Sequence, residues 1–438
     1  MTGERLLISG GRVVDPAHGV DVVGSVCIAD GVVVAVGDRP AGFVPDREFQ
    51  VPGQIVCPGF IDLSARLREP GQAHKGTIDS EGLAALAAGF TTVCVPPDTV
   101  PVIDSPAVVK LIFERAQQAD RAHVLPIGAL TRGLNGRDLS ELSALQSSGC
   151  LAVGNAGVPL ASNLVMRRAF EYAAGYDLLV CVRPQDAALR DDGCVHEGVV
   201  ATRLGLPGIP EAAETVAVAE ALVLVELTGV RVHFGPISSA RAMRLIAAAQ
   251  QQGLPVSADT AMHQLHLTEL DVDGFNALCH VDPPLRTTAD RDALRAAVAA
   301  GTIGALCSDH QPHDPDAKLQ VFPATEPGMA TLETVLPLGL RLVAEGVLSV
   351  PELVARLTVG PARILGLPAG HLGVGAAADL CVFHPQRSWV IGDATWHSAG
   401  RNTPYWGDEM LGRVTLVVVG GRVVEPNGAL TSVEQRQP

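Results

Sequence analysis

The sequence predicts an α/β protein with a (β/α)8 barrel of the TIM type and a small β-sandwich domain built from both ends of the chain. The middle of the chain alternates short apolar, β-branched segments with Ala-rich segments of helical character, which is typical of a parallel barrel. Both ends contain only short strand-like segments separated by Gly, Asp and Pro. We therefore predict a β-domain formed by 1–57 together with 366–438, and a barrel over 58–365.

The terminal strands are predicted from β-branched runs bounded by turn residues. The two ends also share a short sequence, Gly-Gly-Arg-Val-Val, at 10–14 and again at 420–424. Similar ends around a different middle favour one domain assembled from both. The expected strands span 6–9, 12–14, 25–29, 32–36 and 54–57 near the start, and 379–383 and 413–419 near the finish.

The barrel elements follow from the change between apolar runs and Ala-rich helical stretches. The expected strands span 91–95, 123–127, 151–153, 177–182, 230–234, 255–259 and 305–308. The expected helices span 79–88, 105–117, 139–148, 162–174, 211–228, 240–251, 289–299 and 330–344. Their regular alternation favours one barrel over two separate domains.

The composition excludes several classes of protein. The net charge is −15 over 438 residues, without a basic run, so no nucleic-acid partner is expected. The apolar stretch 82–97 is broken by Gly89, Pro96 and Pro97, and the first residues lack the features of an export signal. Nine cysteines occur singly, without a C-x-x-C pair, as in a reducing compartment. We expect a cytoplasmic protein with no membrane partner.

One segment, from Pro58 to Gly71, carries the most information about function. It reads PGFIDLSARLREPG and resembles the PGFID-x-H-x-H-x-REPG segment of class I dihydroorotases, a family of the amidohydrolase superfamily. In that family the two histidines alternate along a strand and hold a divalent metal ion. Here these positions are Ser64 and Arg66, and a guanidinium offers no lone pair to a metal.

The resemblance to dihydroorotases extends over essentially the whole chain. It rests on several segments that occur in the family's order, and their order makes chance similarity improbable. These segments lie at 67–71, 91–93, 205–210, 283–286, 308–313, 328–334, 378–380 and 401–404.

The family's remaining metal positions can be located in the same way. The bridging carboxylate or carboxylated lysine corresponds to Asn155, and the next two histidines correspond to Arg183 and Pro236. Only Asp309 remains, which the resemblance identifies as the family's metal ligand and general base. One carboxylate cannot hold a catalytic zinc ion, which uses three protein ligands. We therefore expect no zinc, no other cofactor and no functional catalytic residue.

The replacements suggest how Asp309 is accommodated. A buried carboxylate without a counter-charge would be costly. Two of the lost ligands are arginines, so we expect Arg66 or Arg183 to form an ion pair with Asp309 in place of the metal.

The substrate pocket keeps only part of the family pattern. The residues that bind the substrate carboxylate in dihydroorotases correspond to Arg68, Asp98 and His313. Asp98 replaces an asparagine and places a negative charge where an anion would dock. The family's NPPLR segment likewise begins with Asp282 in this chain, and both changes point away from dihydroorotate binding. We also expect an internal pair between Arg68 and Asp98, which would close the pocket to anions.

Several other histidines leave a metal site open as an alternative. His263 and His266 are spaced as on one helical face, and His310 and His313 flank Asp309. His74 with Lys75, and His280, lie in neighbouring loops. The plainer interpretation is that these are loop or supporting residues.

The resemblance implies a particular function. Inactive dihydroorotase homologues of some bacteria associate with aspartate carbamoyltransferase in a large complex of both chains. We therefore predict a non-catalytic subunit of de novo pyrimidine (UMP) biosynthesis that scaffolds or stabilises this partner, self-associates and joins a hetero-oligomer. Two alternatives remain: a cyclic amidohydrolase with one metal on Asp309 and nearby histidines, and a regulatory subunit that senses a small molecule through Arg68 and His313.

Overall fold

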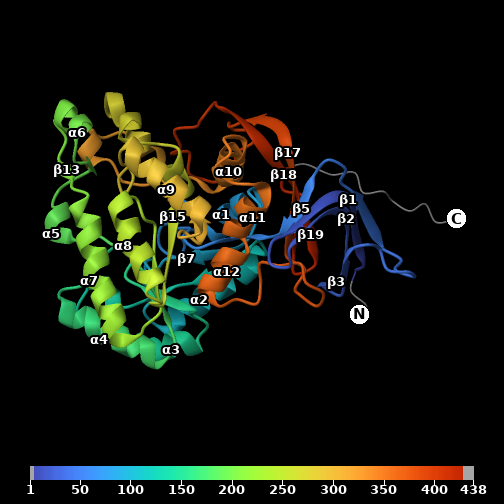
Figure 1. Ribbon diagram of the computed structural model, residues 1–438, viewed down its shortest axis with the longest axis horizontal. Helices are drawn as coiled ribbons and strands as arrows, with labels where there is room; N and C mark the ends of the chain where they lie inside the picture. The colour runs from blue at the N-terminus through green and yellow to red at the C-terminus, as the bar shows by residue number, and fades with distance from the viewer. Residues whose placement is uncertain (1–3, 428–438) are drawn as a thin grey trace.

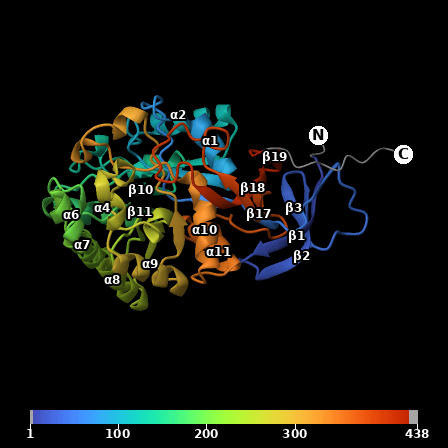
Figure 2. The same ribbon diagram turned by 90° about the horizontal axis from the view of Figure 1, so that it is seen from above.

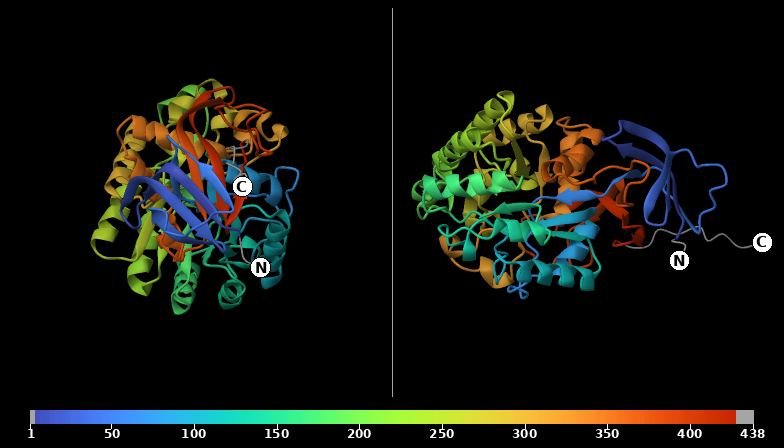
Figure 3. Two further views of the ribbon diagram at one scale, coloured as in Figure 1. Left: turned by 90° about the vertical axis from the view of Figure 1, so that its right-hand side faces the viewer. Right: turned by 90° about the horizontal axis from the view of Figure 1, so that it is seen from below.

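The computed structural model describes residues 4–427, so the ends of the predicted β-domain, 1–3 and 428–438, lie outside the described residues. A barrel of strands and helices lies at one end of the molecule and a β-rich domain at the other (Figures 1 and 2). Figure 3 shows the N-terminal strands as a separate layer beside the barrel helices. The domain boundaries at 57/58 and 365/366 stay predictions. In the structure the strand β5 ends at Pro58 and the helix α12 ends at Leu365.

The β-domain is one sheet that contains strands from both ends of the chain. Among the described residues it has eight strands in the order β19-β18-β17-β5-β1-β2-β3, with β4 also paired to β1. The two ends meet where β5 runs antiparallel to β17. The strands are β1 (Leu6–Asp15), β2 (Val20–Ala29), β3 (Val32–Gly37), β4 (Arg47–Gln50), β5 (Ile55–Pro58), β17 (Leu380–Val390), β18 (Glu409–Val419) and β19 (Arg422–Val424).

The sheet folds over on itself to enclose a small core. Alternate residues of β1, β2, β17 and β18 are buried together in one apolar cluster that is separate from the barrel core. The opposite ends of the sheet also meet at two turns. A side chain at Gly421 would lie 2.5 Å from the Cα of Gly31, so both turns require glycine there.

The barrel has eight parallel strand positions in the described part of the chain, because β8 and β9 share the third position and join a three-stranded sheet to a six-stranded one. A bridge between Ala65 and His310 closes the first strand onto the last. The strands are β6 (Phe60–Asp62), β7 (Phe90–Val95), β8 (His123–Pro126), β9 (Gly128–Ala129), β10 (Ala152–Gly154), β11 (Leu179–Val182), β14 (Val232–Phe234), β15 (Val256–Ala261) and β16 (Ala305–Cys307).

Helices surround these strands, and several begin at side-chain caps. Thr77, Ser239 and Thr287 each accept a hydrogen bond from a backbone N–H in the first turn of the following helix. The helices are α1 (Ile78–Ala87), α2 (Pro106–Ala119), α3 (Leu142–Ser147), α4 (Asn163–Gly175), α5 (Ala187–Arg190), α6 (Val199–Leu204), α7 (Ala212–Thr228), α8 (Ala240–Gln251), α9 (Thr288–Ala300), α10 (Val335–Ala344), α11 (Val350–Leu357) and α12 (Val359–Leu365). A short pair, β12 (Val195–His196) and β13 (Gly208–Ile209), lies between α5 and α7.

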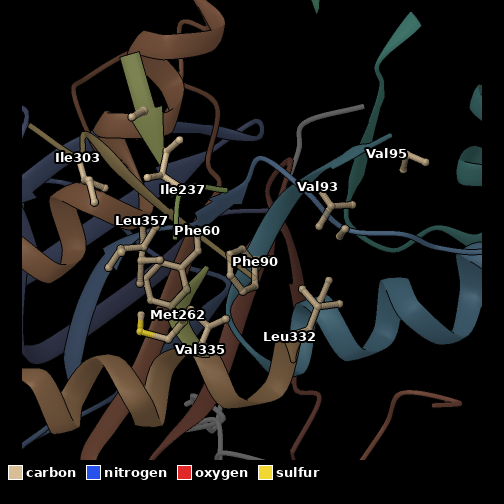
Figure 4. Close-up of a cluster of buried hydrophobic side chains, with 14 of the residues drawn as sticks. Phe60, Phe90, Val93, Val95, Ile237, Met262, Ile303, Leu332, Val335 and Leu357 are labelled. Carbon is tan, nitrogen blue, oxygen red and sulfur yellow. The ribbon is translucent and has the colours of Figure 1, made fainter. Parts of the chain in front are cut away.

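The barrel core continues to the contact with the β-domain. Phe60 and Phe90 pack edge to face with ring centroids 5.7 Å apart, and Phe60 also lies against Phe383 of β17. Figure 4 shows the two rings beside Met262 and Val335 in this core. Branched aliphatic side chains fill the remaining space, as the sequence composition predicts.

The observed elements confirm the predicted fold class, with differences at some ends. Strands expected at 6–9 and 12–14 form one strand, β1, with a bulge between Ser9 and Gly11. The helix expected from 330 begins at Val335, after a 3-10 turn over Leu332–Thr334. No helix within 4–427 combines the length and apolar character needed to cross a membrane.

Candidate functional site

The candidate site lies at the barrel mouth, where the carboxyl ends of the barrel strands meet. Beyond β6 the chain stays extended, since Ala65 N–H donates to Cys94 and Arg66 N–H donates to His310. Side chains alternate along such a segment. Ser64 and Arg66 therefore share one face and line the central cavity.

Asp309 is the centre of this site. It follows β16, is 2% exposed and has a φ of 46°, a left-handed conformation that aspartate tolerates better than most residues. Its Oδ1 atom lies 3.4 Å from the Arg183 guanidinium, 3.6 Å from the Arg66 guanidinium and 3.4 Å from the Ser64 hydroxyl. Gln311 donates to its Oδ2 atom at 3.2 Å. The expected ion pair is confirmed, and both arginines take part.

The two arginines determine the charge of Asp309. Burial alone would raise the pKa of this carboxyl, but Arg183 and Arg66 outweigh burial and hold the pKa below its ordinary value. Arg66 is buried too, which by itself would lower its pKa, yet Asp98 and Asp309 raise it overall. The site is therefore a buried ion cluster in which the charged forms of Asp309 and Arg66 stabilise each other.

One expected contact differs in the structure. Asp98 pairs with Arg66, whose Nε atom donates to Oδ2 at 2.6 Å, and not with Arg68. Arg66 reaches Asp98 because it points toward the barrel axis, whereas Arg68 turns away through a left-handed backbone with φ of 64°. The predicted pair between Arg68 and Asp98 was therefore wrong, and the charge of Asp98 is neutralised by Arg66.

Arg68 and His313 do lie together at the rim of the mouth. Arg68 donates to the Pro312 carbonyl at 2.8 Å and lies 3.2 Å from the Nε2 atom of His313. Within residues 4–427 no carboxylate forms an ion pair with Arg68. Burial and the charge of Arg66 lower the pKa of Arg68 to about 10, and burial beside Arg68 and Lys75 lowers the pKa of His313 far below its ordinary value.

Asn155 and Pro236 occupy the two remaining positions that correspond to metal ligands in the family. The amide of Asn155 accepts from the Thr131 hydroxyl at 2.8 Å and donates to the Val158 carbonyl at 2.8 Å, which fixes the loop after β10. Pro236 lines the cavity and offers no donor atom.

The residues at this site do not fit the divalent metal of the family. Where that family places imidazoles and a carboxylate, this chain has a hydroxyl, an amide, a proline and two cationic guanidiniums. Both guanidiniums contact Asp309, the one carboxylate left. A metal ion there would meet two like charges and a single anionic ligand. Among the described residues, no three His, Cys, Asp or Glu side chains are grouped to hold a metal.

The histidines considered as alternative ligands lie in different surroundings. His310 is fully buried, with Nε2 2.8 Å from Glu81 and Nδ1 accepting from the Thr331 N–H, so both ring nitrogens are engaged. His263 is buried near Asp309, and neither ring nitrogen has a hydrogen-bond partner in the described protein. Burial lowers the pKa of His263 to about 4.

The other histidines serve elsewhere. His266 ends a short 3-10 turn in which its N–H donates to the His263 carbonyl, and its side chain lies near Arg295. His280 stacks on Phe322, with ring centroids 4.8 Å apart. His74 lies at the surface, 3.5 Å from Asp314.

Several cavities adjoin the ion cluster, and two of them show how it is placed. A small cavity of ≈ 60 Å³ lies between the arginines and the barrel interior, where His233 and Asp259 are 3.2 Å apart. A wider pocket of ≈ 560 Å³ opens above them, and its wall includes Arg68 and His313. The ion cluster thus forms the floor of an open pocket.

Sequence reasoning missed several residues of this site. Gln311 supports Asp309, and Glu81 binds His310 from α1. His233 and Asp259 form a buried pair inside the barrel. The buried contact of Glu81 could have been predicted from the sequence, because an acidic residue within an apolar stretch requires a buried hydrogen-bond partner.

Comparisons with known proteins agree with this description. A dihydro-orotase-like family model matches residues 53–242, and an amidohydrolase family model matches residues 339–425. A "Dihydroorotase-like protein" from Pseudomonas aeruginosa is 51% identical over 95% of this chain and 98% of its own length. A "Dihydroorotase" from Anaeromyxobacter dehalogenans is 46% identical over 96% of this chain and 97% of its own length.

Solved structures show the same fold at lower identity. L-hydantoinase from Arthrobacter aurescens is 22% identical with a TM-score of 0.86, covering 98% of both chains. Dihydropyrimidinase from Brevibacillus agri is 21% identical with a TM-score of 0.83, covering 98% of this chain and 96% of its own. From its overall sequence similarity and its fold, the chain belongs to the dihydroorotase-like family of amidohydrolases.

Proposed function

We propose that this chain is a non-catalytic dihydroorotase-like subunit that scaffolds or stabilises aspartate carbamoyltransferase in de novo pyrimidine (UMP) biosynthesis. One observation carries the proposal: the carboxylate that would serve as general base, Asp309, is buried between the guanidiniums of Arg66 and Arg183. The pseudoenzyme character therefore rests on the groups present at the site.

The chemistry of a cyclic amide explains why this arrangement is unsuitable for hydrolysis. Attack on an amide near neutral pH requires a strongly nucleophilic water and a general base whose pKa is near the working pH. The pKa of Asp309 lies below its ordinary value, so this carboxylate is a weak base. Its oxygens lie within hydrogen-bond distance of arginine, serine and glutamine groups.

The retained fold supports a role for the surface of the molecule. The barrel, its closing bridge and the two-ended β-domain are all built. A chain that keeps its fold while its reactive groups are replaced is suited to binding another protein. Two Pseudomonas relatives at 51% identity are named "Dihydroorotase-like protein", whereas relatives at 46% are named "Dihydroorotase", and the difference in name agrees with a departure from the enzyme.

The test uses this chain and the aspartate carbamoyltransferase of the same organism. We would measure molar mass by light scattering on a sizing column and assay carbamoyltransferase activity across the same peak. The proposal predicts one large complex that carries the activity, with the transferase less active or less stable alone. Separate peaks with a fully active free transferase would contradict it.

A small-molecule sensor is the second candidate, and one contact favours it. Because Arg66 pairs with Asp98, Arg68 has no carboxylate partner among residues 4–427, and its positive charge faces the ≈ 560 Å³ pocket, where it could attract an anion. Calorimetric titration with dihydroorotate and with UMP tests this role. Binding that is lost in Arg68→Met would support a sensor, and absence of binding to wild-type protein would exclude these two ligands.

A further inference from the structure

A side pocket next to the ion cluster is the feature that carries a further inference. It lies under the loop that follows β10 and extends to α4 and α7, two helices that pack against each other in the helix ring (Figure 1). Its volume of ≈ 80 Å³ holds about six water-sized atoms. Most of its wall is apolar, with side chains that include Leu130, Met166, Phe170, Val182 and Ala217.

The side pocket opens toward the barrel mouth at a polar end. Arg183 and Gln185 line both the side pocket and the ≈ 560 Å³ pocket at the mouth, so the two spaces adjoin there. The amide of Gln185 already donates to Asp282 at 2.8 Å. Arg183 is therefore the polar group at this end that can meet a ligand.

The loop over the side pocket has a defined shape. Asn155 donates to the Val158 carbonyl through its amide, and the Val158 N–H donates back to the Asn155 carbonyl. Gly157, inside this turn, has a φ of 81°, and a side chain there would lie 3.0 Å from the Cδ atom of Arg183. The stem of Arg183 therefore passes directly beside the turn, which keeps its guanidinium between the two pockets.

The guanidinium of Arg183 is only partly satisfied by the protein. Its Nη1 atom lies 3.4 Å from Asp309, and over residues 4–427 its other nitrogens have no hydrogen-bond partner. The ion cluster and its rim also contain three guanidiniums for two carboxylates, namely Arg66, Arg68 and Arg183 against Asp98 and Asp309. One positive charge is thus unmatched, and an anion beside Arg183 would balance it.

We propose that the side pocket binds a small carboxylic acid with a compact apolar group. The carboxylate pairs with Arg183, and the apolar group fills the space between the loop, α4 and α7. A mostly apolar wall with one well-placed charged group is typical of small-molecule sites. Removal of the apolar group from water supplies affinity, and the guanidinium selects an anion.

This site goes beyond the proposed function, because a ligand can occupy it whether or not the transferase is bound. It also differs from the sensor considered above, whose ligands are polar and meet Arg68. An empty side pocket would leave the transferase complex untouched, and absence of that complex would leave the side pocket untouched.

The first experiment compares three probes on the wild-type chain by ligand-observed NMR titration. Cyclohexanecarboxylate carries both a ring and a charge, cyclohexanecarboxamide keeps the ring without the charge, and acetate keeps the charge without the ring. We expect cyclohexanecarboxylate to bind at least about tenfold more tightly than the amide and at least about a hundredfold more tightly than acetate. No binding of cyclohexanecarboxylate, or equal binding of either other probe, would overturn the proposal.

The second experiment locates the site with variants of the full chain. Ala217→Leu places a branched side chain inside the side pocket and should abolish binding of cyclohexanecarboxylate, and Arg183→Leu should weaken it by at least about tenfold. Ala219→Leu, on the exposed side of α7, is the matched control and should leave the Kd unchanged. Circular dichroism and the thermal midpoint verify that each variant folds. Binding that survives Ala217→Leu, or that is lost equally in Ala219→Leu, would contradict this assignment.

Discussion

The barrel mouth has two layers that differ in the way their charged groups are paired. The cavity layer, which faces the pocket, has lost the ligand pattern of the family and is now an ion cluster around Asp309. The support layer behind it consists of buried acids that remain fully hydrogen-bonded. Glu81, for example, is unexposed and binds His310, the Ser398 hydroxyl at 2.6 Å and the Ala399 N–H at 3.0 Å.

Other acids of the support layer behave in the same way. Asp62 binds the hydroxyl and the N–H of Ser308 and so joins the first and last barrel strands. Glu214 of α7 accepts from the backbone of Ser238 and Ser239 after β14. These contacts hold the loops of the mouth without the metal. The difference teaches that hydrogen-bonded acids behind the pocket hold the fold of the mouth, separately from the charged groups that face the pocket.

The largest expected effect comes from breaking the support layer. Glu81→Ala should lower the free energy of unfolding by about 3–5 kcal/mol, because it leaves His310, Ser398 and a backbone N–H buried without their acceptor. Urea unfolding at neutral pH measures the change. Glu171→Ala is the matched control, since Glu171 is exposed and pairs with Arg167 on the surface of α4, where such a pair contributes about 0.3–0.5 kcal/mol. Equal losses in the two variants would remove the distinction between the layers.

A smaller effect is expected in the cavity layer. Asp309→Asn should lower the free energy of unfolding by about 2–3 kcal/mol, because Arg183 loses its one carboxylate while Arg66 keeps Asp98. Arg183→Leu should cost less than Asp309→Asn, since Arg66 still neutralises the carboxylate. The same unfolding assay ranks the two variants. A greater loss in Arg183→Leu would show that Arg66 is not an effective counter-ion.

Acid is expected to have the most gradual effect and to act oppositely on the two layers. Burial lowers the pKa of His263 from 6.5 to about 4, so the unfolded chain takes up its proton first and stability is lost as the pH falls from 6.5 to 4. Burial raises the pKa of Asp62 to about 7, so the folded state binds its proton first and stability is gained as the pH falls below 7. Net loss is expected, because four more histidines share the lowered pKa: His196, His266, His280 and His313.

Two variants separate these contributions. His263→Asn should reduce the loss of thermal stability between neutral and mildly acidic pH, and Asp62→Asn should increase it. Each thermal midpoint is compared with that of wild-type protein at the same pH. Identical pH profiles for all three proteins would contradict the assignment of these two groups.

The sequence was sufficient to predict the barrel, the two-ended β-domain and the ion pair of Asp309. Apolar periodicity determines where barrel strands and helices form, and a buried carboxylate between two arginine positions requires a counter-charge. These inferences use local pattern and charge balance, which are visible along the chain. The family resemblance indicated which positions along the chain would lie together at the barrel mouth.

Side-chain direction could not be predicted in the same way. Arg66 and Arg68 are two positions apart, and only the backbone conformation of Arg68, with φ of 64°, shows that Arg66 is the partner of Asp98. The contact between Glu81 and His310 joins residues 229 positions apart. Such contacts depend on how helices and loops pack over the barrel, which neither spacing nor composition specifies.

Metal content tests the central claim, that an ion cluster has replaced the metal site, most directly. The wild-type chain and Asp309→Asn would be purified without chelator from cells grown with added zinc, and metal would be measured per chain by mass spectrometry. Dihydroorotate hydrolysis would be assayed on the same samples. We predict far less than one metal per chain in both proteins and no hydrolysis. Stoichiometric zinc that supports hydrolysis in the wild-type chain and is lost in Asp309→Asn would contradict the account.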